Sequence, residues 1–204
     1  MKRILITVAC TLISGIMYAQ AILVATGADA LMPEHGFLPG RAFKFYPALE
    51  KYDFGGKKLR VEIYDERDSL KLTSVECSTI PLTNSSEFKG VNGAEKVVEY
   101  FDTLFRQSNI IVDSLSTDTL KIHLLALDNR MIGFGNITAH GLCQLRVEYK
   151  GISKGYCEDI TDKSPHSPIG KNAFVTRKTA TRVIQSASLR EIIEQILVDL
   201  KSLI

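Results

Sequence analysis

The segment from Ser188 to Leu203 constrains the fold most, because it predicts an amphipathic helix that must pack against other elements. Ser188 and Glu191 have the spacing of a helix-capping box. The apolar residues that follow form one broad stripe along the segment: Leu189, Ile192, Ile193, Ile196, Leu197, Leu200 and Leu203. Such a helix owes most of its stability to burial of the stripe, so truncation of the chain at Glu191 is expected to abolish folding.

Several other segments have the pattern of β-strands. Residues 58–64 alternate apolar and charged side chains, which is typical of a strand with one buried face. Residues 120–127 are almost continuously apolar, which is typical of a central strand. Residues 142–149 are expected to pair with residues 156–160 as a hairpin, with a turn at 151–155. Two further stretches, 72–82 and 174–185, are expected to be extended, with a helix left open for the second.

Another amphipathic helix is expected from Gly93 or Ala94 to about Arg106, with Asn92 as its cap. The order of elements is then strand, helix, strand, strand, strand, helix. This order predicts an α+β fold in which the helices pack on a mixed or antiparallel sheet. Residues 58–204 are expected to form it as a single α/β domain.

Residues 1–21 have the features of a secretory signal peptide. Lys2 and Arg3 precede an apolar run, and Ala19-Gln20-Ala21 is a small-x-small cleavage site. The alternatives are an uncleaved membrane anchor over residues 4–25 and lipidation of Cys10, which lacks a large aliphatic residue three positions earlier. Residues 22–57 follow as a tether and N-terminal segment. The protein is therefore expected to be exported, to the periplasm or the outer membrane.

The charge balance argues against one class of partner. The chain has 25 Lys and Arg against 23 Asp and Glu, and the two extra cations are Lys2 and Arg3. The remainder is neutral overall, so it has no global field that would concentrate a nucleic acid.

Export leaves three cysteines, Cys77, Cys143 and Cys157. In an oxidising compartment they permit one disulfide and one free thiol. Cys143 and Cys157 lie on strands expected to be neighbours, so they are the expected pair; three buried reduced thiols are the alternative. None of the spacings is CxxC, so no zinc site is indicated.

The charged run at the end of the first strand supplies the candidate binding residues. Asp65 and Asp68, with Glu66 between them, could act as paired carboxylates or bind a hard cation. Arg67 partly neutralises them, and such a run is most often a solvated turn. Asp65, Arg67 and Asp68 are therefore weak candidates for binding, and no catalytic residue is assigned.

Residues 151–155 match the G-x-S-x-G motif, with Ser153 at its centre. Asp159 or Asp162 and then His166 follow in the order used by α/β-hydrolases. A nucleophile elbow needs a helix after the serine, whereas residues 156–160 predict a strand, so a hairpin turn is favoured. The histidines are scattered and predict no metal site: His35, His123, His140 and His166.

Four segments together resemble the YajG-like family of bacterial cell-envelope lipoproteins: the strand 61–64 with the charged residues 65–67, the strand 120–124, the strand around 145–149, and the helix 188–203. They are more distantly similar to the N-terminal domain of TolB-type envelope assembly factors. The missing lipobox departs from the lipoprotein pattern. The resemblance spans residues 58–204 and implies a non-enzymatic envelope component without a cofactor.

The expected function is therefore that of an envelope-associated binding or assembly accessory protein. An envelope protein, a lipid or a polysaccharide is the expected partner, with membrane association if the N-terminal segment stays uncleaved. The alternative is a small secreted hydrolase that uses Ser153 or the carboxylates of Asp65 and Asp68.

Overall fold

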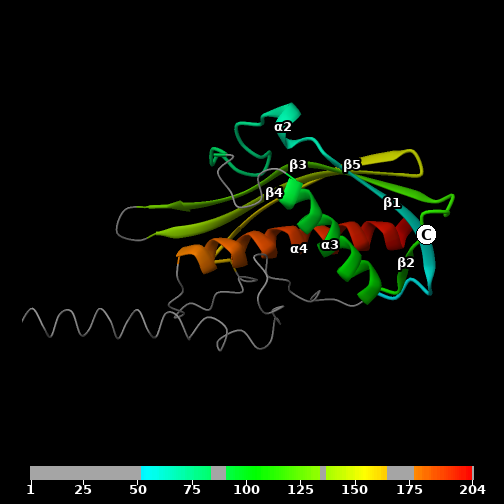
Figure 1. Ribbon diagram of the computed structural model, residues 1–204. Coiled ribbons are helices and arrows are strands. Elements are labelled where there is room, and N and C mark those ends of the chain that lie inside the picture. Colours follow the sequence, from blue (N-terminus) through cyan, green and yellow to red (C-terminus); the bar gives the residue numbers. More distant parts are fainter. Residues whose placement is uncertain (1–51, 84–90, 134–136, 165–176, 204) are drawn as a thin grey trace, which may run out of the picture.

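The computed structural model of the chain describes residues 52–83, 91–133, 137–164 and 177–203, which form a mixed β-sheet with two long helices on one face (Figure 1). The strands are β1 (Lys57–Asp65), β2 (Ile110–Val112), β3 (Thr119–Ile132), β4 (Thr138–Tyr149) and β5 (Ile152–Thr161). The helices are α2 (Arg67–Leu70), α3 (Val91–Gln107) and α4 (Arg177–Leu203). The predicted α+β class, with helices packed on a mixed sheet, is confirmed. The predicted signal peptide and most of the tether lie outside the described residues.

The strands lie in the order β2-β1-β3-β4-β5. The central strand β3 pairs in parallel with β1 and antiparallel with β4, and β5 returns beside β4 as the predicted hairpin. The short edge strand β2, parallel to β1, has no counterpart among the predicted strands. The β4–β5 turn consists of Lys150 and Gly151 alone, so the prediction of a turn through residue 155 is wrong.

Both long helices begin earlier than predicted. Helix α4 begins at Arg177, so the capping box expected at Ser188 and Glu191 is wrong. Ser188 lies inside the helix, where its hydroxyl donates to the carbonyl of Gln185 at 2.9 Å. Helix α3 begins at Val91, so the cap expected at residue 92 is also wrong.

The extended structure expected for residues 174–185 is wrong over the part that the structure describes. Val183 and Ile184 belong to α4 and are buried. Side-chain burial here outweighs a β-propensity that amounts to about 1 kcal/mol at most. The stretch 72–82 makes one isolated bridge, between Ser74 and Pro81, and otherwise runs as a loop.

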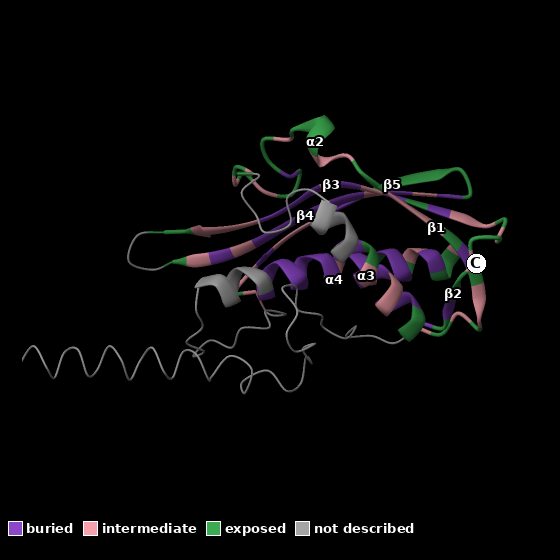
Figure 2. Ribbon diagram, in the orientation of Figure 1, coloured by how far each residue is buried: buried purple, intermediate pink, exposed green. Residues whose placement is uncertain are grey.

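The main core lies between the sheet and the two long helices, where Figure 2 shows buried segments on both sides. Alternate residues of a strand point to opposite faces, so the helix-facing positions of β3 and β4 are apolar while many of their neighbours are polar. Helix α4 contributes most of its predicted stripe to this core: Leu189, Ile192, Ile193, Ile196, Leu197 and Leu200.

Helix α4 approaches the sheet closely at Gly141 of β4. A Cβ atom placed on Gly141 would lie 2.4 Å from the carbonyl oxygen of Ile184 and 2.8 Å from the amide nitrogen of Gln185. Both are backbone atoms of α4, so neither can be moved without shifting the helix. The absence of a side chain at this position therefore allows the helix and the strand to make contact.

Candidate functional site

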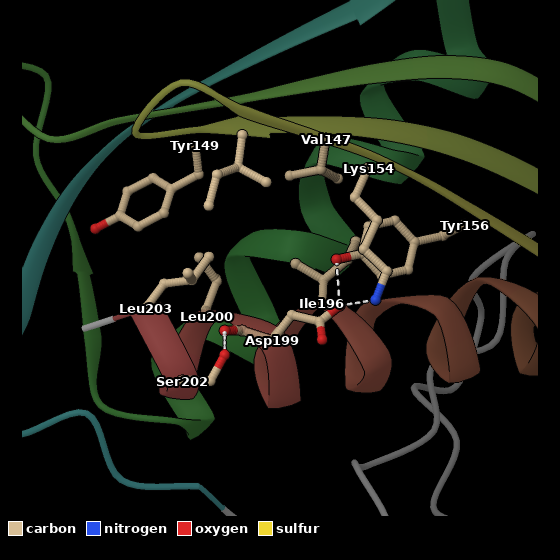
Figure 3. A pocket seen from close by; sticks show the side chains of 10 residues that line it. Val147, Tyr149, Lys154, Tyr156, Ile196, Asp199, Leu200, Ser202 and Leu203 are labelled. Carbon is tan, nitrogen blue, oxygen red and sulfur yellow. Dashed lines mark hydrogen bonds and ion pairs between the residues drawn. The ribbon is translucent and has the colours of Figure 1, made fainter.

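A pocket of about 190 Å³ lies between the β4–β5 hairpin and the last turns of α4 (Figure 3). Its lining is mostly apolar and aromatic, with a lysine, an aspartate and a serine: Val147, Tyr149, Ile152, Lys154, Tyr156, Ile196, Asp199, Leu200, Ser202 and Leu203. The hairpin supplies one wall and the helix supplies the other.

The local periodicities of the two elements bring these side chains together. On the hairpin, Tyr149 pairs with Ile152 and Val147 pairs with Lys154, so all four belong to the face that looks toward α4. On α4, residues three or four positions apart lie on one side of the helix. Lining residues 196, 199, 200 and 203 have this spacing. The side chains that face the pocket therefore recur every two residues along the strands of the hairpin and about every 3.6 residues along the helix.

One carboxylate organises the polar part of the pocket. The Nζ atom of Lys154 and the hydroxyl of Tyr156 each donate to Oδ2 of Asp199, both at 2.6 Å. Burial works to raise the pKa of Asp199, but the hydrogen bonds from Lys154 and Tyr156 outweigh it, so the pKa lies below the usual value of an aspartate. Burial, together with the hydrogen bond to Asp199, raises the pKa of the Tyr156 hydroxyl. Near neutral pH Asp199 is thus a carboxylate and Tyr156 a protonated phenol.

A second lysine, Lys150, is not part of the lining but contacts two residues that are, Leu203 and Tyr149. The Nζ atom of Lys150 donates to the carbonyl oxygen of Leu203 at 3.1 Å and lies 5.3 Å from the centre of the Tyr149 ring. We call these two lysines, Lys154 in the lining and Lys150 next to it, together with the carboxylate of Asp199, the rim of the pocket.

A wider hollow of about 460 Å³ lies between α3 and strands β1 and β2. Val61, Ile63 and Phe101 line it, and two acidic residues, Glu99 and Asp102, belong to the same lining. The charged residues of this lining are both acidic, whereas the lining of the pocket beside α4 holds one lysine and one aspartate.

The structure does not bring Ser153 together with a histidine and an aspartate. Ser153 lies within strand β5, on the face of the sheet away from α4. The strand continues to Asp159, which is six residues further and hence about 20 Å away. His166 lies outside the described residues, and Asp162 accepts a hydrogen bond from the backbone amide of Ala139. The motif is thus part of a strand without the helix that a nucleophile elbow needs.

The charged run at the end of β1 is occupied by internal contacts. Arg67 donates to Asp65 through Nε at 2.8 Å and Nη2 at 2.6 Å, and this pairing lowers the pKa of the Asp65 carboxyl. Asp68 is exposed on the short helix α2. Asp65 and Arg67 are therefore paired with each other, and Asp68 is an exposed residue of the following helix.

Glu66 makes long-range contacts that the sequence does not predict. One of its carboxylate oxygens lies 2.5 Å from Nδ1 of His123, and the other lies 3.4 Å from Nη2 of Arg146. The His123 ring also stacks on Tyr64, with 5.1 Å between ring centres. The available sequence signal is only that His123 and Arg146 occupy the polar face of alternating strands. These residues form a polar cluster on the face of the sheet opposite α4.

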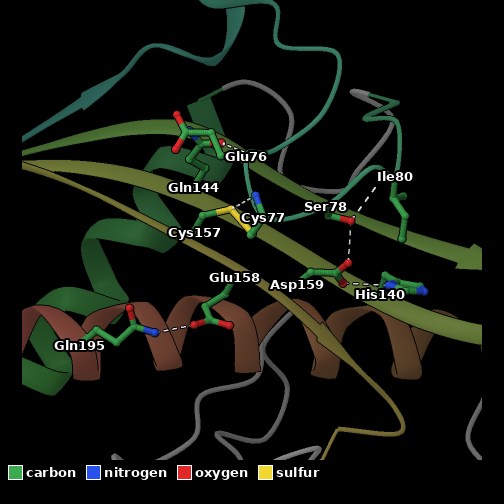
Figure 4. Close-up of a disulfide and its surroundings, with 10 residues drawn as sticks. All are labelled: Glu76, Cys77, Ser78, Ile80, His140, Gln144, Cys157, Glu158, Asp159 and Gln195. Atoms are coloured by element: carbon green, nitrogen blue, oxygen red, sulfur yellow. Dashed lines mark hydrogen bonds and ion pairs between the residues drawn. A yellow bond between two sulfur atoms is a disulfide. The ribbon is translucent and has the colours of Figure 1, made fainter.

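The disulfide joins Cys77 to Cys157, so the predicted Cys143–Cys157 pair is wrong (Figure 4). The register of the hairpin gives the reason, because Cys157 lies opposite Gln144 while Cys143 lies opposite Glu158. The two cysteines therefore point to opposite faces of the sheet. Cys143 is buried in the core beneath the helices, where burial raises the pKa of its thiol. The disulfide instead attaches the loop around Cys77 to the face of the sheet opposite the long helices.

Other contacts hold the same loop against the sheet. The hydroxyl of Ser78 donates to Asp159 at 2.7 Å, and Asp159 also lies 2.8 Å from Nδ1 of His140 (Figure 4). The backbone amide of Glu76 donates to the side chain of Gln144 at 3.0 Å. In this group the aspartate lies between the serine and the histidine, so the histidine is not placed to take a proton from the serine.

We expect loss of the disulfide to destabilise the fold strongly. The bond closes a segment with a sequence separation of 80 residues. A Cys77→Ala variant should therefore unfold with a free energy lower by about 2–4 kcal/mol, as measured by urea denaturation. Cys143→Ala is the control, and it should keep the disulfide. A reducing agent should destabilise the native protein and the control, but not Cys77→Ala; equal sensitivity of all three would contradict the assigned pairing.

Two properties of the described part of the chain bear on the class of site. No set of three histidine, cysteine or acidic side chains there is arranged to hold a metal ion. Among the helices that the structure describes, none combines the length and the apolar character needed to cross a membrane.

Comparison with known proteins gives only distant similarities. No protein-family model matches the sequence, and no curated protein matches it. The structure is similar to that of a DUF330 protein from Xanthomonas campestris, with a TM-score of 0.48 and 10% identity over 76% of this chain and 89% of that chain. A hypothetical protein from Chlamydia trachomatis is similar with a TM-score of 0.41 and 9% identity, over 70% of this chain and 96% of that chain.

A minor lipoprotein from Acinetobacter baumannii is similar with a TM-score of 0.36 and 9% identity, over 71% of this chain and 92% of that chain. The three structures come from bacteria, and one of them is a lipoprotein. None of them points to the YajG-like family specifically, which stays a prediction. With such TM-scores and identities, the similarities carry no argument about function.

Proposed function

We propose that this chain is an exported, envelope-associated protein that works by binding and does not catalyse a reaction. The observation that carries the proposal is the Cys77–Cys157 disulfide. Structural disulfides are characteristic of oxidising compartments and are rare in the cytosol. The sequence of residues 1–21, which has the features of an export signal, supports the same compartment independently.

The chemistry of the pocket beside α4 supports binding over catalysis. Two of its polar groups are held by a third, because Lys154 and Tyr156 both donate to Asp199. A tyrosine with a raised pKa is a poor nucleophile and a poor general base near neutral pH. The remaining walls are apolar, and concave apolar sites with a few fixed polar groups are typical of ligand binding. Of the expected partners, we therefore favour one that presents an apolar group.

Fractionation of cells tests the compartment. The full chain and a version without residues 2–21 would be produced in a bacterium, and each fraction would be examined by intact mass spectrometry. We expect the full chain in the periplasmic or membrane fraction, with a new N-terminus after Ala19 or Ala21. The shortened chain should stay in the cytosol with reduced cysteines. Retention of the full chain in the cytosol, with residues 1–21 intact, would overturn the proposal.

A further inference from the structure

We propose that the pocket between the β4–β5 hairpin and α4 binds the hydrocarbon chain of a single-chain anionic amphiphile, such as a fatty acid, with the anionic group held at Lys154 and Lys150. This inference rests on the proposed binding function and names its ligand class. The size of the pocket, its lining and the charges at its rim carry it.

The size and lining of the pocket suit a hydrocarbon chain. Its volume is about 190 Å³. An apolar cavity of about 150 Å³ in another protein stays dry and takes up benzene, so a space of this kind is large enough for part of an alkyl chain. Figure 3 shows Val147, Ile196, Leu200 and Leu203 around the space between hairpin and helix. Contact with these side chains would remove the chain from water, which is the main source of affinity for an apolar ligand.

The charges at the rim favour an anionic head group over a cationic or neutral one. Lys154 is bonded to Asp199 but exposes 55% of its side chain, and an ammonium has three donors. Lys150 is bonded to a neutral carbonyl, so its charge is not cancelled in that contact. The carboxylate of Asp118, which lies near enough to interact with the charge of Lys150, is paired with Lys57. Both rim lysines can therefore donate to a carboxylate at the mouth while the hydrocarbon chain lies inside.

The wider hollow beside α3 is one competing site. Two acidic side chains, Glu99 and Asp102, belong to its lining. Asp102 is paired with Arg106, and neither this arginine nor any lysine belongs to the lining, so the hollow offers an anion no cationic side chain of its own. The two sites also lie on different sheet edges, because one includes β2 and the other includes β5. A reporter placed at the mouth of the α4 pocket therefore distinguishes them.

A single introduced tryptophan provides that reporter, because the chain has no tryptophan of its own. Ser202 lines the pocket, is exposed, and donates its hydroxyl to the carbonyl of Asp199 in its own helix. Ser69 of α2 is its matched control, because it too is an exposed serine whose hydroxyl bonds the carbonyl three residues earlier. Figure 1 shows α2 on the other side of the sheet from α4.

The experiment titrates purified, disulfide-bonded Ser202→Trp and Ser69→Trp proteins with dibromostearic acid below its micelle concentration. Bromine atoms quench tryptophan fluorescence on contact. We expect saturable quenching in Ser202→Trp and none above the background of free tryptophan in Ser69→Trp. Equal quenching of the two variants, or no quenching in a Ser202→Trp protein that keeps its cooperative thermal transition, would overturn the inference.

A charge variant tests the head-group contact within the Ser202→Trp background. Lys154→Gln should weaken binding of dibromostearic acid by about three- to tenfold and leave binding of the brominated alcohol unchanged. Lys58→Gln is the matched control, because Lys58 is also an exposed lysine paired with an aspartate, Asp113, at 3.2 Å. Equal affinity for acid and alcohol, unaffected by Lys154→Gln, would refute the anionic head group.

Failure of this test is distinguishable from failure of the proposed function. A chain that reaches the envelope but does not bind the amphiphile would leave the compartment proposal intact. Binding of the amphiphile by a chain that stays in the cytosol would contradict only the proposed compartment.

Discussion

A chain truncated at Glu191 is expected not to fold, because it loses the part of α4 that closes the core. The missing segment holds buried side chains that pack on the sheet: Ile192, Ile193, Ile196, Leu197 and Leu200. Burial of each contributes about 1.5–3 kcal/mol. Together they approach the total stability of a typical domain, which is about 5–15 kcal/mol. Circular dichroism during heating should show no cooperative transition.

Point variants in the same helix separate the effect of burial from that of helix length. Ile193→Ala removes a fully buried side chain and should lower the free energy of unfolding by about 2–5 kcal/mol. Val198→Ala alters a side chain that is 50% exposed, and it should change the stability by less than about 0.5 kcal/mol. A soluble truncated protein with a cooperative thermal transition would refute the role assigned to α4.

Gly141→Ala is expected to destabilise the protein by about 3 kcal/mol, near the upper end of the usual cost of overpacking. The new methyl group would lie 2.4 Å from the carbonyl oxygen of Ile184, which is backbone and cannot rotate away. Helix α4 would have to move off strand β4, and the contacts on both sides of Gly141 would loosen. Urea denaturation measures the loss.

Gly155→Ala is the matched control, because Gly155 lies in the neighbouring strand and a Cβ atom there meets nothing within 4 Å. This variant should be neutral or slightly stabilising, because alanine restricts the unfolded chain more than glycine does. A Gly141→Ala protein as stable as Gly155→Ala would show that the backbone of α4 does not contact β4 closely at Gly141.

Much of the fold can be predicted because it depends on local periodicity. The alternation in residues 58–64 and 142–149 and the stripe of α4 each report one buried face, and together they indicate helices on a sheet. The start of α4 cannot be predicted in this way. Thr and Val residues near position 180 favour strands locally, and only the tertiary packing of side chains such as Val183 overrides that preference.

The disulfide cannot be predicted from strand adjacency because it depends on register. A shift of one residue moves a side chain to the other face of the sheet, and Cys143 and Cys157 are out of phase by one position. The segment that contains Cys77 has no regular pattern of apolar and polar residues. The sequence therefore does not indicate that this segment packs on the face of the sheet opposite the long helices.

The pocket cannot be predicted from the sequence, for a different reason. Its apolar residues are recognisable as members of a strand and of a helix, but the space between them depends on where α4 crosses the hairpin. The pairing of Lys154 with Asp199 joins residues 45 positions apart, and no local pattern relates them. Residues recognised from motifs, such as Ser153 and Asp65, instead lie in ordinary strand positions.

The most direct test of the proposal for an exported protein is the state of the cysteines in living cells. Cells producing the full chain would be quenched with acid, alkylated under denaturing conditions, and digested without reduction for mass spectrometry. The expected result is a linked pair of peptides that contain Cys77 and Cys157, with Cys143 alkylated. Recovery of Cys77 and Cys157 as separately alkylated thiols would contradict the assignment of this protein to an oxidising compartment.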